Sequence, residues 1–172
     1  MPREFQLVAF QLGEETYGVD ISQVEEIIRL QPITRVPGAP DFVEGVINLR
    51  GRVIPVIDLR KRFHLPPREE TKNTRIVVVE VPPNTVGMIV DAVDEVLRIS
   101  EDNIEAPSLI ISSIDTEYIK GVGKLEDKLL ILLDLAKVLT KEEKGALQTM
   151  KEEMEKEKEE KEKEEKEGEK EN

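Results

Sequence analysis

Two aspartates, Asp58 and Asp134, are the residues whose types and spacing could support acid–base catalysis. They occupy equivalent positions in two similar stretches of the chain, and a pair of carboxylates can act as general acid and general base. Each aspartate, however, directly precedes a Leu-x-Lys segment, which is typical of a helix N-cap. We therefore expect both to be N-caps, and a small-barrel hydrolase that uses them remains an alternative.

The other side chains offer little for catalysis or metal binding. The chain has no cysteine and one histidine, His64, in a proline-rich loop, which excludes disulfide scaffolds, thiolate sites and multi-histidine metal sites. Phosphate-binding and dinucleotide-binding glycine motifs do not occur. Arg50, in an Arg-Gly turn, can present its planar guanidinium to a carboxylate, although it could also be a solvated turn residue. These observations favour a binding module without catalytic residues, cofactor or metal.

The charge is distributed unevenly along the 172 residues, which carry a net charge of −12. Residues 151–172 contain 12 Glu and 7 Lys and contribute −5 of this charge. We therefore divide the chain into a folded unit, residues 1–150, and a charged tail, residues 151–172, which we expect to be disordered or a frayed, solvated helix. The acidic balance argues against nucleic acid binding. No apolar run approaches about 18 residues, so we expect a cytosolic protein that does not insert into membranes.

An internal repeat is the most informative feature of the folded unit. Residues 45–63 align without a gap on residues 121–139, at an offset of 76, with six of 19 positions identical. Upstream, Gly18 and Val24–Ile27 match Gly87 and Val93–Val96 at an offset of 69. The difference implies a seven-residue insertion in the second copy, within residues 103–116. The repeat predicts two units of about 70 residues that share an interface.

Short apolar runs around tight turns indicate that each unit consists mainly of strands. Helical spacing from Ile21 to Ile28 predicts a short helix, and Asp41 with Glu44 resembles a capping box for a helical turn. A closing helix is expected after Asp134. The small size and the odd number of strands favour two small β-barrels. The predicted hairpins join residues 5–12 to 16–19, 45–49 to 52–59, 75–81 to 86–90, and 125 to 129–133.

Several of these segments together resemble the CheW family of bacterial chemotaxis proteins, over roughly Glu4 to Leu139. The most specific match is Gly-Val-Ile-Asn-Leu-Arg-Gly at positions 45–51, and single elements such as Tyr17–Asp20 are weaker. The segments that carry the resemblance are Phe5–Leu12, Tyr17–Ile21, Val24–Ile27, Arg35–Pro37, Phe42–Arg60, Gly87–Asp91 and Leu130–Asp134.

The resemblance implies an all-β fold of two five-stranded SH3-like barrels, built by internal duplication with interleaved boundaries and packed around a shared core with short helices. It also implies a non-catalytic adaptor that couples the cytoplasmic tips of methyl-accepting chemotaxis receptors to the regulatory domain of the histidine kinase CheA. The protein would be cytoplasmic and recruited to receptor arrays at the inner face of the cell membrane, where self-association stays open. The alternatives are a CheW-like module of another chemosensory system, the CheW-like domain of a fusion such as CheV, or a CheA regulatory domain.

The resemblance also assigns candidate contact residues. It places kinase binding at Val24 and Gly45, where a structural role for Gly45 is expected as well. The contact that forms array rings falls near Leu109, within the insertion. A receptor helix tip would insert between the barrels, with polar contacts at their rim. The residues implied for receptor binding are Glu26, Ile27, Arg50, Val93 and Val96.

Overall fold

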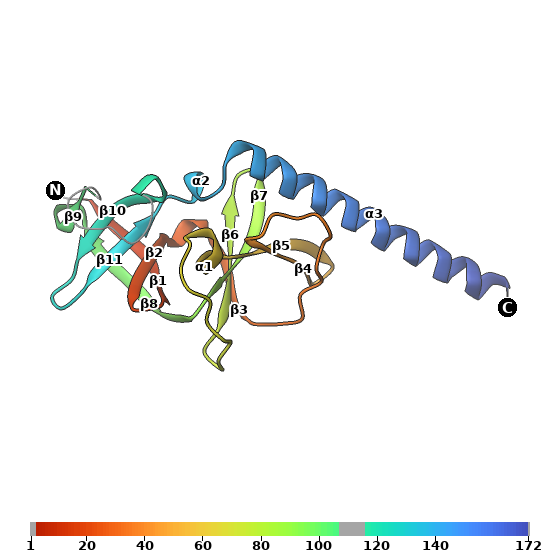
Figure 1. Ribbon diagram of the computed structural model, residues 1–172, viewed down its shortest axis with the longest axis horizontal. Helices are drawn as coiled ribbons and strands as arrows, with labels where there is room; N and C mark the ends of the chain where they lie inside the picture. The colour runs from red at the N-terminus through yellow and green to blue at the C-terminus, as the bar shows by residue number, and fades with distance from the viewer. Residues whose placement is uncertain (1–2, 107–115, 172) are drawn as a thin grey trace.

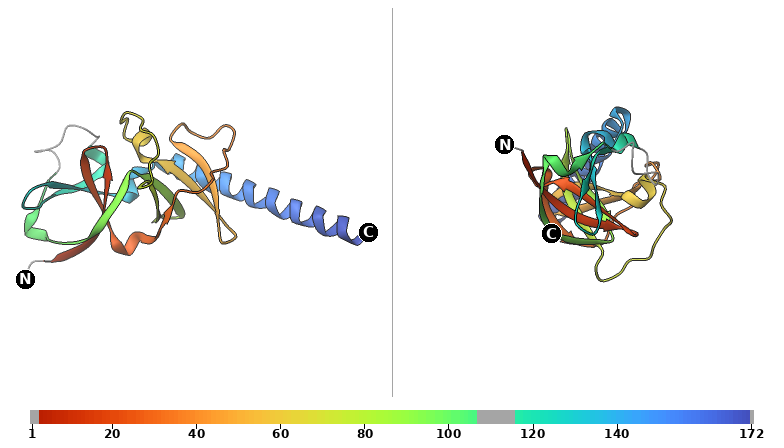
Figure 2. Two further views of the ribbon diagram at one scale, coloured as in Figure 1. Left: turned by 90° about the horizontal axis from the view of Figure 1, so that it is seen from below. Right: turned by 90° about the vertical axis from the view of Figure 1, so that its left-hand side faces the viewer.

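A computed structural model describes residues 3–106 and 116–171 of the chain (Figure 1). Two β-sheets lie side by side, and a long helix, α3 (Lys141–Glu171), runs past the second sheet and carries the C-terminus away from both. Figure 2 shows the same elongated arrangement from below in its left view, and its right view looks along the long axis of the molecule. Within the described part of the chain, no helix combines the length and the apolar character needed to cross a membrane.

The first sheet has six strands, in the order β8-β1-β2-β11-β10-β9. Neighbouring strands are antiparallel except β2 and β11, which are parallel. Strands from the start and the end of the chain therefore meet in one sheet. The strands are β1 (Glu4–Leu12), β2 (Glu15–Asp20), β8 (Ala92–Ser100), β9 (Ile104–Glu105), β10 (Ile119–Lys124) and β11 (Leu129–Leu133).

The second sheet has five strands, in the order β3-β6-β7-β5-β4, with one parallel pair, β5 and β7. Its strands are β3 (Val24–Arg29), β4 (Val43–Leu49), β5 (Arg52–Asp58), β6 (Arg75–Val81) and β7 (Asn84–Val90). Short helical segments connect the strands. They are η1 (Ile21–Gln23), α1 (Leu59–Arg62), η2 (Glu101–Asn103), η4 (Thr116–Tyr118) and α2 (Leu135–Val138).

The internal repeat relates the two sheets strand by strand. The order β3-β6-β7-β5-β4 corresponds to β8-β1-β2-β11-β10. In the two parallel pairs, Val56 lies beside Gly87 and Leu132 lies beside Gly18, and these residues are equivalent at the offsets of 76 and 69. Each sheet thus combines the first hairpin of one copy with the second hairpin of the other. Neither copy forms a sheet by itself, which explains why the two remain together.

Apolar side chains from both sheets form a shared core. One buried cluster draws residues from both sheets and from α3, while each sheet also encloses a smaller cluster of its own. A row of aromatic rings crosses the shared cluster: Phe10, Tyr17, Phe63 and Tyr118, with successive centroids 5.9, 6.0 and 5.5 Å apart. Because aromatic rings bury large apolar areas, this row contributes strongly to the packing of one sheet against the other.

Two predicted helical segments are wrong. Asp20 caps only one 3-10 turn, through a 2.9 Å bond from the Ser22 N–H, and the chain then enters strand β3. The apolar residues of β3 fit a strand because its burial alternates and its partner, β6, comes from the other copy of the repeat. Val43 likewise pairs with Ile57 instead of continuing a helical turn from Asp41. Tertiary pairing overrides a weak local helix signal in both places.

The sheets are confirmed, but their closure into barrels stays a prediction, because the backbone pairings among the described residues leave both sheets open. Helix α3 begins at a reciprocal capping box, in which the Thr140 N–H donates to Glu143 and the Glu143 N–H donates to Thr140. Leu147 and Met150 are buried against the shared core. Residue 150, where the sequence suggested that the folded unit ends, lies inside this continuous helix.

Candidate functional site

Asp58 and Asp134, the two candidate catalytic carboxylates, are helix caps. Asp58 accepts a hydrogen bond of 2.9 Å from the Arg60 N–H at the start of α1, and Asp134 accepts one of 3.1 Å from the Ala136 N–H at the start of α2. Burial raises the pKa of the Asp58 carboxyl above its ordinary value, and the backbone bonds at the cap only partly oppose this. Because each carboxylate bonds to the N-terminus of a different helix, the two do not form an acid–base pair.

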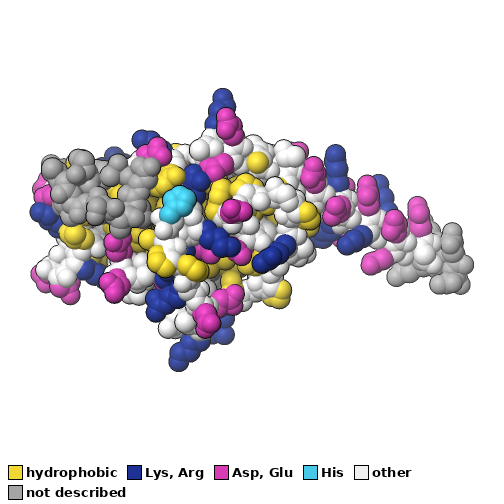
Figure 3. Space-filling model, viewed as in Figure 1, with side chains coloured by type: hydrophobic (Ala, Val, Ile, Leu, Met, Phe, Trp, Pro, Cys, Tyr) yellow, Lys and Arg dark blue, Asp and Glu magenta, His cyan; other side chains and the backbone are white. Residues whose placement is uncertain are grey.

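His64 is exposed, on the loop after α1, and is visible on the surface in Figure 3. Its backbone has a φ of +58°. Among the residues that the structure describes, no group of three or more His, Asp or Glu side chains could hold a metal ion.

Among the predicted contact residues, the β4–β5 turn carries two arginine–glutamate pairs. Arg50 at its tip forms a double hydrogen bond with Glu26 on β3, and Arg52 donates to Glu25 at 3.1 Å. Strand β3 is one edge of the five-stranded sheet, and the β4–β5 hairpin ends at the other edge, β4, so these bonds link the two sides of the sheet through side chains. The Arg50 bond lowers the pKa of the Glu26 carboxyl, which keeps that carboxylate ionised.

The backbone of this turn, residues Asn48–Arg52, has an uncommon conformation. Arg50 has a φ of +52° and Gly51 a φ of +86°. Two consecutive residues with positive φ are typical of the tight turn that matches the twist of a β-hairpin, where Asn and Gly are the usual residues. Arg50 occupies this position although it bears a side chain, and the cost of such a conformation is typical of functional positions. We name residues Asn48–Arg52 the Arg50 turn.

Two exposed apolar residues, Ile27 and Val96, lie on the edge strands β3 and β8. Ile27 is 41% exposed and Val96 is 54% exposed, whereas most large apolar side chains are buried. The two residues are equivalent at the repeat offset of 69, so each sheet presents one apolar residue at the same place on its edge. Val24 and Val93, also equivalent, are instead partly buried against the shared core. The structure therefore exposes two of the four predicted valine and isoleucine contacts.

Gly45, a predicted kinase contact, is buried and tightly packed. It has a φ of +147°, and a Cβ atom added there would lie 2.1 Å from the carbonyl oxygen of Thr34. A bridge between Thr34 and Val46 holds that carbonyl in place. Gly45 thus has a structural role at the beginning of β4. Leu109, the predicted ring contact, lies outside the described residues.

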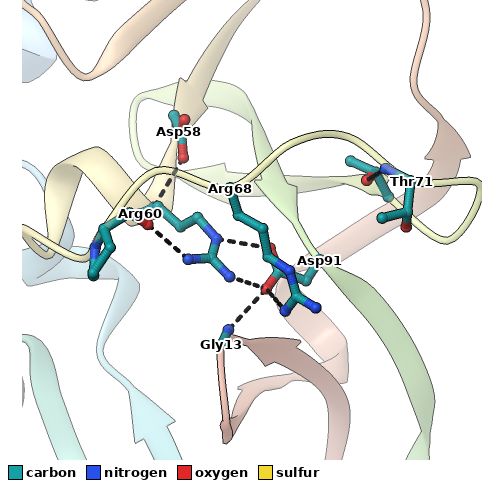
Figure 4. A network of polar contacts seen from close by, with 8 residues as sticks. Gly13, Asp58, Arg60, Arg68, Thr71 and Asp91 are labelled. Atoms are coloured by element: carbon teal, nitrogen blue, oxygen red, sulfur yellow. Dashed lines mark hydrogen bonds and ion pairs between the residues drawn. The ribbon is translucent and has the colours of Figure 1, made fainter.

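An ion pair between a buried arginine and a partly buried aspartate, which the sequence interpretation missed, joins the two sheets (Figure 4). Arg60, 9% exposed, donates twice to Asp91, whose carboxylate also accepts from the Gly13 N–H at 2.8 Å. Arg68 approaches the same carboxylate at 3.5 Å. Burial alone would raise the pKa of Asp91, but these donors outweigh burial and lower it. One indication of this pair was present in the sequence: each charged residue directly follows a predicted strand, Arg60 after β5 and Asp91 after β7.

Replacing Asp91 by asparagine is expected to lower the free energy of unfolding by about 2 kcal/mol at pH 7, because Arg60 keeps its burial and loses its charged partner. The folded-state pKa of Asp91 lies below its unfolded value of about 3.9. Its contribution is therefore present above that pH and is lost as the pH falls through the folded-state pKa. Denaturant titrations from pH 7 to pH 3 should show the difference between wild type and variant shrinking below about pH 4.

Arg68 offers the control for this experiment. Its side chain is 57% exposed, so Arg68→Met should change the free energy of unfolding by no more than about 0.5 kcal/mol. A cost of Asp91→Asn that stayed constant down to pH 3 would contradict the assignment of that cost to the ion pair.

Known proteins provide an independent comparison. A family model described as CheW-like domain matches residues 6–143. The chain is 41% identical to "Chemotaxis protein CheW" of Treponema pallidum, over 81% of this chain and 85% of that protein. It is 38% identical to the protein of the same description from Klebsiella aerogenes, over 80% and 83%. The crystal structure of the scaffolding protein TtCheW from Thermoanaerobacter tengcongensis is similar with a TM-score of 0.75 and 43% identity, covering 83% of this chain and 92% of that one.

Proposed function

The chain belongs to the CheW family of non-catalytic chemotaxis scaffold proteins, and from this premise we propose that it couples the cytoplasmic tips of methyl-accepting receptors to the histidine kinase CheA. One observation carries the receptor half of the proposal. An exposed apolar residue occurs at the same place on both edge strands, Ile27 on β3 and Val96 on β8, and Arg50, held in a costly conformation, bonds to Glu26, the residue before Ile27.

We infer that a receptor helix tip binds by helix-in-groove recognition, with its apolar face on Ile27 and Val96 and its polar groups near Arg50 and Glu26. Val93, which is only partly buried, would line the inner part of this surface. Arg50 suits such a rim because its guanidinium can bind a carboxylate in a planar, two-point geometry. A shift of the receptor would then change kinase activity by favouring one of two arrangements of the bound proteins.

We assign kinase binding to the five-stranded sheet, around Val24 and Gly45, where the CheA regulatory domain would pack its own barrel. The side-chain bridges from Glu25 and Glu26 on the edge strand β3 to Arg52 and Arg50 of the β4–β5 hairpin support closure of this sheet into a five-stranded SH3-like barrel. We also propose a ring contact of the second barrel near Leu109, self-association in arrays, and a cytoplasmic location at the inner face of the cell membrane. A role in another chemosensory system would leave these surfaces unchanged and alter only the partners.

Two titrations test the proposal, one of the full chain with a CheA regulatory domain and one with a receptor-tip fragment, each followed by isothermal calorimetry. We expect saturable binding in both, and simultaneous binding of the two partners because the residues assigned to them differ. Addition of the chain to receptors and CheA should then raise kinase activity. The proposal fails if neither titration gives binding. Binding to the regulatory domain of a different chemosensory kinase alone would favour the alternative system.

A further inference from the structure

Helix α3 contacts the Arg50 turn at a point beyond the segment that matches the family model. That match ends at residue 143, whereas the Lys158 Nζ donates a hydrogen bond of 3.1 Å to the carbonyl oxygen of Gly51. The two residues are separated by 107 positions in the sequence. The charged tail therefore reaches the same turn to which we assign the receptor contact.

Packing of α3 brings Lys158 to this position. Leu147 and Met150 are buried, and Met154 packs partly against the shared core. Lys158 follows Leu147 by 11 residues, about three helical turns, so both lie on the same face of the helix. Near the start of the helix, the Asn84 side chain donates to the Lys144 carbonyl at 2.9 Å. The docked face thus begins near the capping box and extends as far as Lys158.

Residues 159–168 of α3 are all exposed. Figure 1 shows this part of the helix continuing beyond the five-stranded sheet. Among the described side chains of α3, Lys158 is the last for which a hydrogen bond or ion pair with the body of the protein is found. Its ammonium group lies where the docked face of the helix ends, and it donates to the turn in a solvent-exposed hydrogen bond.

The Arg50 turn benefits from such support. Arg50 and Gly51 both have positive φ, and a non-glycine residue there is strained unless its surroundings hold it. The Gly51 N–H donates to the Asn48 side chain at 2.8 Å, and the Gly51 carbonyl accepts from Lys158. Both polar groups of the Gly51 backbone are therefore bonded. The Asn48 contact fixes the peptide that follows Arg50, and the Lys158 contact fixes the next peptide, between Gly51 and Arg52.

We propose that Lys158 is a positioning residue for the receptor contact. By binding the Gly51 carbonyl, the docked α3 holds the Arg50 turn in the conformation that presents the Arg50 guanidinium at the rim of the site. This inference rests on the proposed function, because it takes Arg50 as a receptor contact. It gives the first part of the charged tail, residues 151–158, a role that the family resemblance does not assign.

The test compares three variants of the full chain: Lys158→Met, Lys158→Arg and Lys161→Met. Lys158→Met removes the donor, Lys158→Arg keeps one, and Lys161→Met makes the same charge change at an exposed position of α3. Amide hydrogen exchange of Gly51, followed by NMR in the free protein, reports the support of the turn. Titrations with the receptor tip and with the CheA regulatory domain report the two partner surfaces.

For Lys158→Met we expect about threefold faster exchange at Gly51 and about threefold weaker receptor binding, the effect of one modest hydrogen bond. Binding to the CheA regulatory domain should not change, which a general loss of stability would not allow. Lys158→Arg should restore wild-type behaviour, and Lys161→Met should not depart from it.

Unchanged Gly51 exchange in Lys158→Met would overturn the proposal, and so would an equal effect of Lys161→Met, which would point to net charge alone. A third result distinguishes the role of Lys158 in the turn from the role of Arg50 in receptor binding. Faster Gly51 exchange, combined with receptor binding that even Arg50→Glu leaves intact, would keep the support of the turn and overturn the assignment of Arg50 to the receptor.

Discussion

Replacing Arg50 by glutamate is expected to weaken binding of the receptor tip by about tenfold or more, and to leave binding of the CheA regulatory domain unchanged. The substitution reverses the charge at the tip of the β4–β5 turn and places a second carboxylate beside Glu26, its present partner. Arg50 is exposed, so the fold does not depend on burying its side chain. Calorimetric titration measures the affinities for the receptor tip and the CheA regulatory domain, and thermal unfolding measures the stability of the variant.

A charge-swapped pair distinguishes two ways in which Arg50 could act. The double variant Glu26→Arg with Arg50→Glu restores an ion pair across the edges of the five-stranded sheet, but it moves the guanidinium to β3. If Arg50 contacts the receptor, the double variant should remain about tenfold weaker than wild type. Full recovery of receptor binding would instead show that the pair acts only by holding the turn. Wild-type affinity in the single variant would remove Arg50 from the receptor site.

Features that depend on neighbouring residues could be predicted from the sequence. The Arg-Gly turn, the β4–β5 hairpin and the capping roles of Asp58 and Asp134 all depend on contacts within a few residues, and the structure confirms them. The strand β3 could not be predicted in this way. Its partner, β6, lies about 50 residues away in the other copy of the repeat, and without that partner the spacing of Val24, Ile27 and Ile28 fits a helix equally well.

The polar contacts of the site show the same limit. Glu26 and Arg50 were both identified as candidates, but their pairing depends on the curvature of a whole sheet, which brings residues 24 positions apart into contact. Lys158 was one of many lysines in a charged segment. Only the docking of Leu147 and Met150 determines which lysine meets the Gly51 carbonyl. Local residue types therefore indicated the candidate side chains, and long-range packing determined their partners.

Replacing Gly45 by alanine is expected to lower the free energy of unfolding by about 3 kcal/mol, the upper range for a strained backbone position. The new Cβ would lie 2.1 Å from the Thr34 carbonyl oxygen, and the backbone has a φ of +147°. Thr34 has little room to yield because its N–H and its carbonyl both bond to Val46, at 2.9 and 2.8 Å. Chemical denaturation followed by circular dichroism measures this loss.

Two other glycines separate the causes of the loss. Gly38 has a φ of +79° with nothing near its Cβ position, so Gly38→Ala isolates backbone strain, at about 1 kcal/mol. Gly121, the repeat equivalent of Gly45, has the Ile104 methyl group as the nearest atom. The Glu105 carbonyl oxygen lies 3.2 Å from the same position, a looser backbone contact than at Gly45, so Gly121→Ala should cost less than Gly45→Ala, at about 2 kcal/mol. Similar losses for all three variants would contradict a backbone clash at Gly45.

The same variant tests how Gly45 relates to kinase binding. If its role is structural, Gly45→Ala reduces binding of the CheA regulatory domain only in proportion to the fraction of unfolded protein, and the loss disappears at a temperature where the variant is fully folded. If Gly45 touches the kinase directly, folded variant molecules bind more weakly at every temperature. Because Gly45 is buried beneath the Thr34 carbonyl, we expect the first result. Kinase contacts would then belong to the exposed residues around β4, which Gly45 holds in place.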